Sequence, residues 1–170
     1  MRKIMIVDDN YLSAEGIEKN IDWEVLNAEI VHICYNGASA IDAMKKEPVD
    51  LIISDIEMPD LDGISMSRQA LDINPMVKII LISAYDKFEY ARRALLLGAL
   101  DYIEKPLDYA YLIQKVKNAF ALMEREQKNL QLLKQSRPLL IEKFFRDITH
   151  RSRQEASYPV SYTHLRAHET

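Results

Sequence analysis

Acidic, hydroxyl and basic side chains stand directly after several short apolar runs of this sequence. Asp8 and Asp9 follow the first run, Asp55 closes the third, Ser83 the fourth and Lys105 the fifth. If the runs are parallel strands, each of these groups lies at the carboxyl end of its strand, and such ends meet in one crevice. Five groups of these types at four strand ends predict a reactive site.

Three carboxylates in one crevice repel each other and stay ionised only when a cation lies among them. Hard oxygen ligands with few protein groups suit Mg²⁺, which bridges to phosphate oxygens. One carboxylate can then attack phosphorus and form an aspartyl phosphate. The Lys105 ammonium would offset charge on the phosphoryl oxygens, and the Ser83 hydroxyl would donate a hydrogen bond to one of them. The alternative is that each aspartate caps a helix and Lys105 is a solvated surface lysine.

The elements that must position these groups alternate between short apolar runs and helical patterns. Helical patterns cover residues 12–21, 39–46, 64–73 and 86–98, and a further one starts near Asp108. The fourth opens with Asp86 and Glu89 in capping-box spacing and stops at Gly98. Five strand–helix units predict an α/β fold with a doubly wound parallel sheet, buried on both faces. The predicted strands are Ile4–Val7, Glu29–Ile33, Leu51–Ile53, Lys78–Ile82 and Leu100–Ile103.

Four strings of residues carry a resemblance to a known family. Taken together, in their order and spacing, they resemble the receiver domains of bacterial two-component response regulators, from Met1 to about Phe120. The resemblance implies a flavodoxin-like fold, a five-stranded parallel sheet of order 2-1-3-4-5, here with a C-terminal helical extension. The strings are Ile6-Val7-Asp8-Asp9, LIISDIEMP over 51–59 with Asp62-Gly63, Ile82-Ser83-Ala84, and DYIEKP over 101–106.

The resemblance also implies a metal site and a phospho-acceptor. Asp55 matches the residue that takes the phosphoryl group in the family, and Lys105 matches the lysine of the family motif. Asp9 and Asp55 match direct Mg²⁺ ligands, Asp8 matches a ligand that acts through water, and Glu57 matches the position whose backbone carbonyl completes the metal shell.

A switch is implied as well. Ser83 and Tyr102 match a pair in which the hydroxyl turns toward the phosphoryl group and the aromatic ring moves inward. Ser83 stands where Thr is commoner in the family, but the hydroxyl is kept. Tyr102 has the alternative of being a plain core aromatic. Glu57 and Tyr85 match positions that tune the lifetime of the phosphoryl group.

The function implied is a signalling switch, not a metabolic enzyme, that takes a phosphoryl group from a sensor histidine kinase and controls a transcriptional output domain. The alternative is a stand-alone relay receiver that acts by protein contact. A phosphatase of the haloacid-dehalogenase type is disfavoured, because its second aspartate stands two residues after the nucleophile, whereas Asn10 follows Asp8-Asp9 here. The strings Ile21-Asp22-Trp23 and Tyr85–Ala91 resemble a branch whose receivers precede an AraC-type helix-turn-helix domain, absent from this chain.

The chain is expected to divide into a receiver domain at 1–122, a helical linker at 123–150 and a disordered tail at 151–170. Pro138 is expected to interrupt the linker. Residues 160–170 (VSYTHLRAHET) look like a translated sequencing adapter, so the native frame is expected to continue past Pro159. The apolar spacing from residue 112 alternates four and three, with Glu126 as the only break, which predicts a heptad seam and a parallel homodimer. Its positions are Leu112, Val116, Ala119, Met123, Leu130 and Leu133.

Composition narrows the classes of partner. The net charge is -4, so nothing predicts DNA binding except through a missing C-terminal domain. A single cysteine, Cys34, allows no disulfide framework. The apolar run at the start is short and leads into two aspartates, unlike a signal peptide, and no run reaches membrane-spanning length. A cytoplasmic protein without membrane contact is expected.

Overall fold

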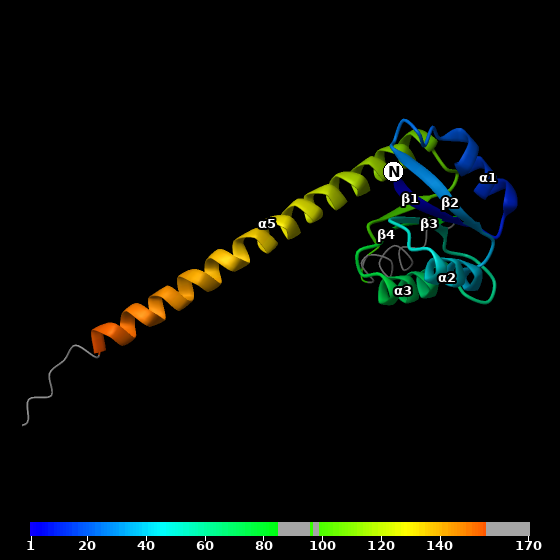
Figure 1. Cartoon of the computed structure of the whole chain (residues 1–170). Helices are drawn as coiled ribbons and strands as arrows, with labels where there is room; N and C mark the ends of the chain where they lie inside the picture. The colour runs from blue at the N-terminus through cyan, green and yellow to red at the C-terminus, as the bar shows by residue number, and fades with distance from the viewer. Residues whose placement is uncertain (85–95, 97–98, 156–170) are drawn as a thin grey trace, which may run out of the picture. The chain divides into compact units, whose positions relative to one another are not determined.

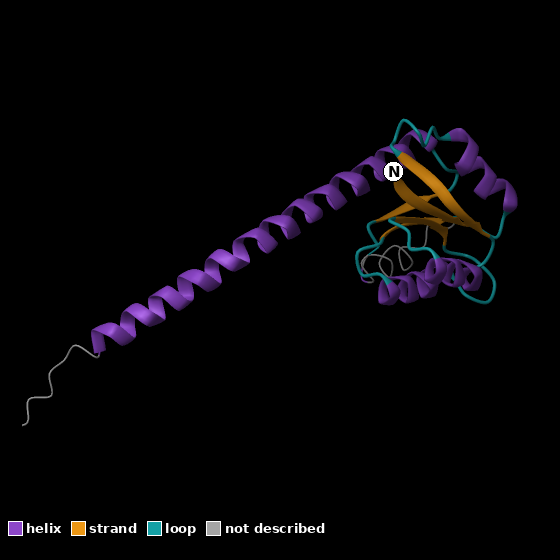
Figure 2. Cartoon of the chain, viewed as in Figure 1, coloured by secondary structure: helices purple, strands orange, loops and turns teal. Residues whose placement is uncertain are grey.

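The first 123 residues form a five-stranded parallel sheet with helices on both faces (Figures 1 and 2). The computed structural model describes residues 1–84, 96 and 99–155. The strand order is β2-β1-β3-β4-β5, so the predicted doubly wound topology is confirmed. The strands are β1 Arg2–Val7, β2 Ala28–Cys34, β3 Leu51–Asp55, β4 Lys78–Ser83 and β5 Asp101–Glu104.

Four helices are described: α1 Tyr11–Asn20, α2 Gly37–Lys46, α3 Gly63–Ile73 and α5 Tyr109–Glu155. Side chains from α2 and α3 pack on one face of the sheet, together with Ile52 of β3. Side chains from α1 and from the first part of α5 pack on the other face, with Ile53 of β3. Every residue of β3 is buried, as a strand covered on both faces requires.

A polar N-cap residue precedes each of the helices α1, α2 and α3. Asn10 caps α1, Asn36 caps α2 and Asp62 caps α3, each accepting a hydrogen bond from a backbone N–H of the first turn. None of the site aspartates 8, 9 and 55 is the N-cap of α1, α2 or α3, although the sequence left that role open. Their carboxylates are therefore available for other chemistry.

Beyond the sheet, the structure differs from the sequence-based expectation at Pro138. Helix α5 continues through this residue to Glu155, so the predicted interruption at Pro138 and the tail starting at 151 are wrong. A proline removes one backbone hydrogen bond and costs about 3 kcal/mol in a helix interior. The Leu, Gln, Lys, Arg and Glu residues around it are strong helix formers, which sustain the helix on both sides.

Two other expectations concern the second half of the chain. The predicted helix at 86–98 and the adapter-like segment 160–170 lie outside the described residues, apart from Leu96, which is helical.

The second compact unit begins at Glu124, and Leu130 and Leu133 are exposed there. Among the helices that the structure describes, none is both long and apolar enough to cross a lipid bilayer.

Candidate functional site

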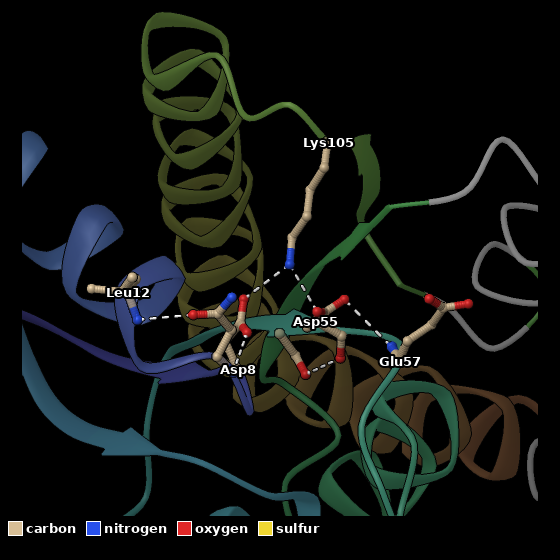
Figure 3. A network of polar contacts seen from close by, with 7 residues as sticks. Asp8, Leu12, Asp55, Glu57 and Lys105 are labelled. Atoms are coloured by element: carbon tan, nitrogen blue, oxygen red, sulfur yellow. Dashed lines mark hydrogen bonds and ion pairs between the residues drawn. The ribbon is translucent and has the colours of Figure 1, made fainter.

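Backbone hydrogen bonds at the ends of the strands hold the polar residues at one edge of the sheet. The Asp8 N–H donates to the Cys34 carbonyl at 3.1 Å, and the Lys105 N–H donates to the Ser83 carbonyl at 2.8 Å. The side chains of Asp8, Asp55 and Lys105 consequently point toward one another, although they come from three separate strand ends (Figure 3).

Three carboxylates meet at this edge. Asp8, Asp9 and Asp55 each offer one oxygen such that all three oxygens lie within 4.8 Å of one another. Asp8 is 1% exposed and Asp55 6% exposed, while Asp9 is open to solvent. A hard divalent cation that prefers oxygen ligands and keeps some of its waters fits this set, because the cluster has one open side. An acidic cluster of this kind is typical of the Mg²⁺ site of receiver domains.

The Lys105 ammonium bridges two of these carboxylates. Its Nζ lies 2.8 Å from Asp55 Oδ2 and 3.2 Å from Asp8 Oδ2 (Figure 3). Burial lowers the pKa of Lys105, but the hydrogen bond and charge of Asp55, with those of Asp8, outweigh it and raise the pKa above its ordinary value. Lys105 therefore stays protonated and offers a fixed positive charge beside Asp55.

The environment of Asp8 shows that one lysine does not balance the cluster. Burial raises the pKa of Asp8, and the charge of Asp55 raises it further. A hydrogen bond from the Asn10 N–H at 2.9 Å and the ammonium of Lys105 oppose this rise without cancelling it. The metal-free site thus carries more negative charge than its surroundings stabilise, and additional positive charge would relieve it.

The structure describes three of the remaining residues predicted for the site. Ser83 is fully buried at the end of β4, beside the backbone of Lys105. Tyr102 is half-buried in β5 and packs on the α2–α3 side of the sheet. The Glu57 N–H lies 3.4 Å from Asp55 Oδ1, while its side chain points away from Asp55 (Figure 3). Tyr85 lies outside the described residues.

Gly63 also shapes the site, although the sequence drew attention to it only as part of a motif. A Cβ atom at this position would lie 2.1 Å from the carbonyl oxygen of Asp55, so only glycine lets α3 approach so closely. The Gly63 N–H donates to the Ile56 carbonyl at 2.9 Å. This contact fixes the backbone immediately after Asp55. The signal in the sequence was a glycine directly after the Asp62 cap.

A cavity of about 310 Å³ adjoins the acidic cluster on the side of α1. Asp8 and Lys105 form its polar end, and Leu12, Ile17 and Leu107 contribute to its apolar walls. Leu12 is 73% exposed, although it is an apolar residue of α1. The edge of the sheet therefore combines charged groups with apolar surface that solvent reaches.

Comparisons with known proteins agree with this geometry. Residues 4–117 match the family model of the response regulator receiver domain. An uncharacterized transcriptional regulatory protein, YesN of Bacillus subtilis (strain 168), is 29% identical over 126 residues, 74% of this chain and 34% of that protein.

Solved structures give the same picture. The REC domain of AraT, a response regulator from Geobacillus stearothermophilus, is 34% identical with a TM-score of 0.70, over 74% of this chain and 98% of that one. A two-component transcriptional regulator AraC from Clostridium phytofermentans ISDg is 30% identical with a TM-score of 0.67, over 76% and 99%.

The relatives thus include AraC-type regulators at moderate identity. This chain spans between a third and a half of the length of the curated relatives that it matches. The match covers the sheet, the acidic cluster and Lys105 without extending into the second unit. The chain belongs to the response regulator receiver domain family.

Proposed function

We propose that this chain is a phospho-accepting receiver in which Asp55 takes a phosphoryl group from the phosphohistidine of a sensor histidine kinase. The observation that carries the proposal is the convergence of three carboxylates within 4.8 Å, with Lys105 only 2.8 Å from Asp55. Asp8, Asp9 and Asp55, with the backbone carbonyl of Glu57, would hold Mg²⁺. When bound, the ion supplies positive charge to the carboxylates and to the phosphoryl oxygens.

The surroundings of the carboxylates favour Asp55 as the nucleophile. Asp8 is almost fully buried and its raised pKa weakens it as an anion, whereas Asp55 has the shorter contact with Lys105. Attack by an Asp55 oxygen forms the O–P bond and breaks the P–N bond, whose electron pair leaves with the imidazole nitrogen. The Lys105 ammonium then pairs with a phosphoryl oxygen, and the Ser83 hydroxyl donates to another.

The switch proposed for the family pair fits the positions of these two side chains. Ser83 is buried beside the Lys105 backbone, and Tyr102 is half-buried one strand away. A hydroxyl that turns toward the new phosphoryl group leaves room for the Tyr102 ring to move inward. In this proposal the chain catalyses its own phosphorylation and dephosphorylation and turns over no metabolite.

The output of the switch is proposed to be transcription. Support comes from the length of the relatives and from the transcriptional regulators among them. DNA would then be bound only through a C-terminal output domain, and the protein would act in the cytoplasm. The rival is a relay receiver that contacts other proteins. Sequencing the reading frame beyond residue 159 decides between them, because a frame that ends there without an output domain favours the relay.

A homodimer is the second part of the proposal, since exposed leucines continue the heptad spacing of α5. Leu112, Val116 and Ala119 are buried, whereas Leu130 and Leu133 in the second unit are 47% and 65% exposed. We expect a fragment of residues 1–155 to form dimers at high concentration when phosphorylated. Analytical ultracentrifugation of this fragment and of L130K/L133K tests the idea; wild-type monomers under all conditions would contradict it.

The phosphoryl chemistry is tested with a small phosphodonor. We expect incubation with phosphoramidate and Mg²⁺ to add one phosphoryl group to the wild type and none to Asp55→Asn, measured by intact mass spectrometry. Asp60→Asn, at a neighbouring exposed carboxylate, is the matched control and should incorporate normally. Undiminished incorporation in Asp55→Asn would refute the assignment.

A further inference from the structure

Two tyrosines that the sequence did not single out lie against each other beside the acidic cluster. Tyr11 is the first residue of α1, and Tyr35 immediately follows β2. Their ring centroids are 5.9 Å apart with a tilt of 37° between the planes. The two residues are 57% and 43% exposed, so the pair lies on the surface rather than in the core. Aromatic rings at this distance attract each other.

The same two segments are also tied together below the rings. The Asp8 N–H donates to the carbonyl of Cys34, the residue before Tyr35, at 3.1 Å. The Asn10 N–H, just before Tyr11, donates to Asp8 Oδ1 at 2.9 Å. The backbone from Asp8 to Tyr11 and the backbone at Tyr35 therefore form a closed loop. The Asp8–Cys34 hydrogen bond closes one end of this loop, and the aromatic pair closes the other.

Asp9 lies in the backbone of this closed loop. It lies between Asp8 and Asn10, and its side chain is exposed, so packing does not immobilise its carboxylate. Its oxygen nevertheless comes within 4.8 Å of those of Asp8 and Asp55. The backbone that carries Asp9 is held by the Asp8–Cys34 and Asn10–Asp8 hydrogen bonds, and the aromatic pair adds a side-chain contact between the start of α1 and the residue after β2.

We infer that Tyr11 and Tyr35 are positioning residues that fix Asp9 for a divalent cation. The inference rests on the proposed function, because it assumes that the acidic cluster binds Mg²⁺. Loss of either aromatic ring lets the Asp8–Tyr11 segment move. Ordering Asp9 then offsets part of the free energy of Mg²⁺ binding to the folded protein. A pair that only covered apolar surface would affect stability and leave the metal affinity of the folded state unchanged.

Magnesium affinity is the first measurement, by titration of backbone amide signals with MgCl₂ in NMR. We expect Tyr11→Ala and Tyr35→Ala each to weaken Mg²⁺ binding by about threefold to tenfold, the range that an aromatic pair supports. The double variant should be no weaker than either single one, and Tyr35→Phe should retain wild-type affinity because the ring contact remains. Tyr111→Ala, at a similarly exposed tyrosine on α5, is the matched control and should bind Mg²⁺ normally.

Amide hydrogen exchange in the metal-free protein gives a second readout. We expect the Asn10 amide to exchange faster in both alanine variants, and not in Tyr111→Ala. If the wild type binds Mg²⁺ and accepts a phosphoryl group while both alanine variants bind Mg²⁺ with unchanged affinity, the inference is overturned. If the wild type binds Mg²⁺ and the variants bind it less tightly but no phosphoryl group is incorporated, the proposed function fails and the positioning role stands.

Discussion

Gly63, the first residue of α3, is a position where one added methyl group should disturb the acidic site without removing a ligand. A Cβ atom there would lie 2.1 Å from the Asp55 carbonyl oxygen and 2.9 Å from Ile56 Cα. Both are backbone atoms, so no side-chain rotation relieves the clash. The Gly63 N–H also donates to the Ile56 carbonyl, so α3 cannot withdraw without losing that hydrogen bond.

The magnitude follows from these contacts. Relieving the clash needs a displacement on the order of 1 Å, and overpacking of this kind costs about 1–3 kcal/mol. Loss of the Gly63–Ile56 hydrogen bond adds about 1 kcal/mol. We therefore expect Gly63→Ala to lower the free energy of unfolding by about 2–4 kcal/mol, which leaves a domain of ordinary stability folded. Misplacing Asp55 by a distance of this order should slow phosphoryl incorporation by about 10²-fold.

Gly16→Ala is the matched control. Its Cβ would lie 2.6 Å from the Tyr109 hydroxyl oxygen, the far end of a side chain that can rotate away. Alanine in a helix interior is also favoured over glycine by about 1 kcal/mol, which offsets the contact. We expect the stability of Gly16→Ala to stay within about 1 kcal/mol of the wild type. Its rate of phosphoryl incorporation should be unchanged.

Two measurements check the reasoning: urea unfolding of the metal-free protein, and the initial rate of phosphoryl incorporation at saturating Mg²⁺. If Gly63→Ala matches the wild type in both, the close approach of α3 to β3 does not exist as described. If its stability falls while its rate stays, the close approach is real but does not set the position of Asp55.

Three further predictions concern the charges and the switch. Lys105→Met should tighten Mg²⁺ binding, because the ammonium no longer competes with the ion for Asp8 and Asp55. Phosphoryl incorporation should slow on the order of 10²-fold. Weaker Mg²⁺ binding in this variant would contradict the reasoning. Burial raises the pKa of Asp8 in the folded state, so at a pH between the ordinary and the raised pKa the folded protein keeps a proton on Asp8 that the unfolded chain has lost. The free energy of unfolding therefore falls as the pH rises from the ordinary pKa of Asp through the raised pKa of Asp8. Asp8→Asn removes this loss, so in EDTA the variant should be about 1 kcal/mol more stable than the wild type at neutral pH, with a smaller gain at acidic pH. Urea unfolding at several pH values measures the gain. An equal gain at all pH values would show that the charge of Asp8 is not its cause. Ser83→Ala should still accept a phosphoryl group but lose phosphorylation-dependent dimerisation in ultracentrifugation, and dimerisation at wild-type strength would exclude Ser83 from the switch.

The sheet could be predicted from the sequence because its strands are too short and too rich in β-branched residues to be helices. The polar residues that follow these strands also indicated which end of the sheet carries the site, because the carboxyl ends of parallel strands lie together. Pro138 was misjudged for a local reason: one lost hydrogen bond does not end a helix whose neighbours on both sides are strong helix formers. The close approach of Gly63 to Asp55 and the pairing of Tyr11 with Tyr35 depend on how separate elements meet in the fold, and no periodic pattern in the sequence records them.

The charges at the site indicate where a conformational change should begin. Two of the three carboxylates contact the Lys105 ammonium, and burial, with the charge of Asp55, still raises the pKa of Asp8. A phosphoryl group on Asp55 would add further negative charge, so Lys105 would have to leave the carboxylates to meet it. The backbone of Lys105 is hydrogen-bonded to Ser83, so movement of the lysine acts directly on the end of β4. We therefore expect a charge added at Asp55 to act first on the paired ends of β4 and β5, the strand that also carries Tyr102.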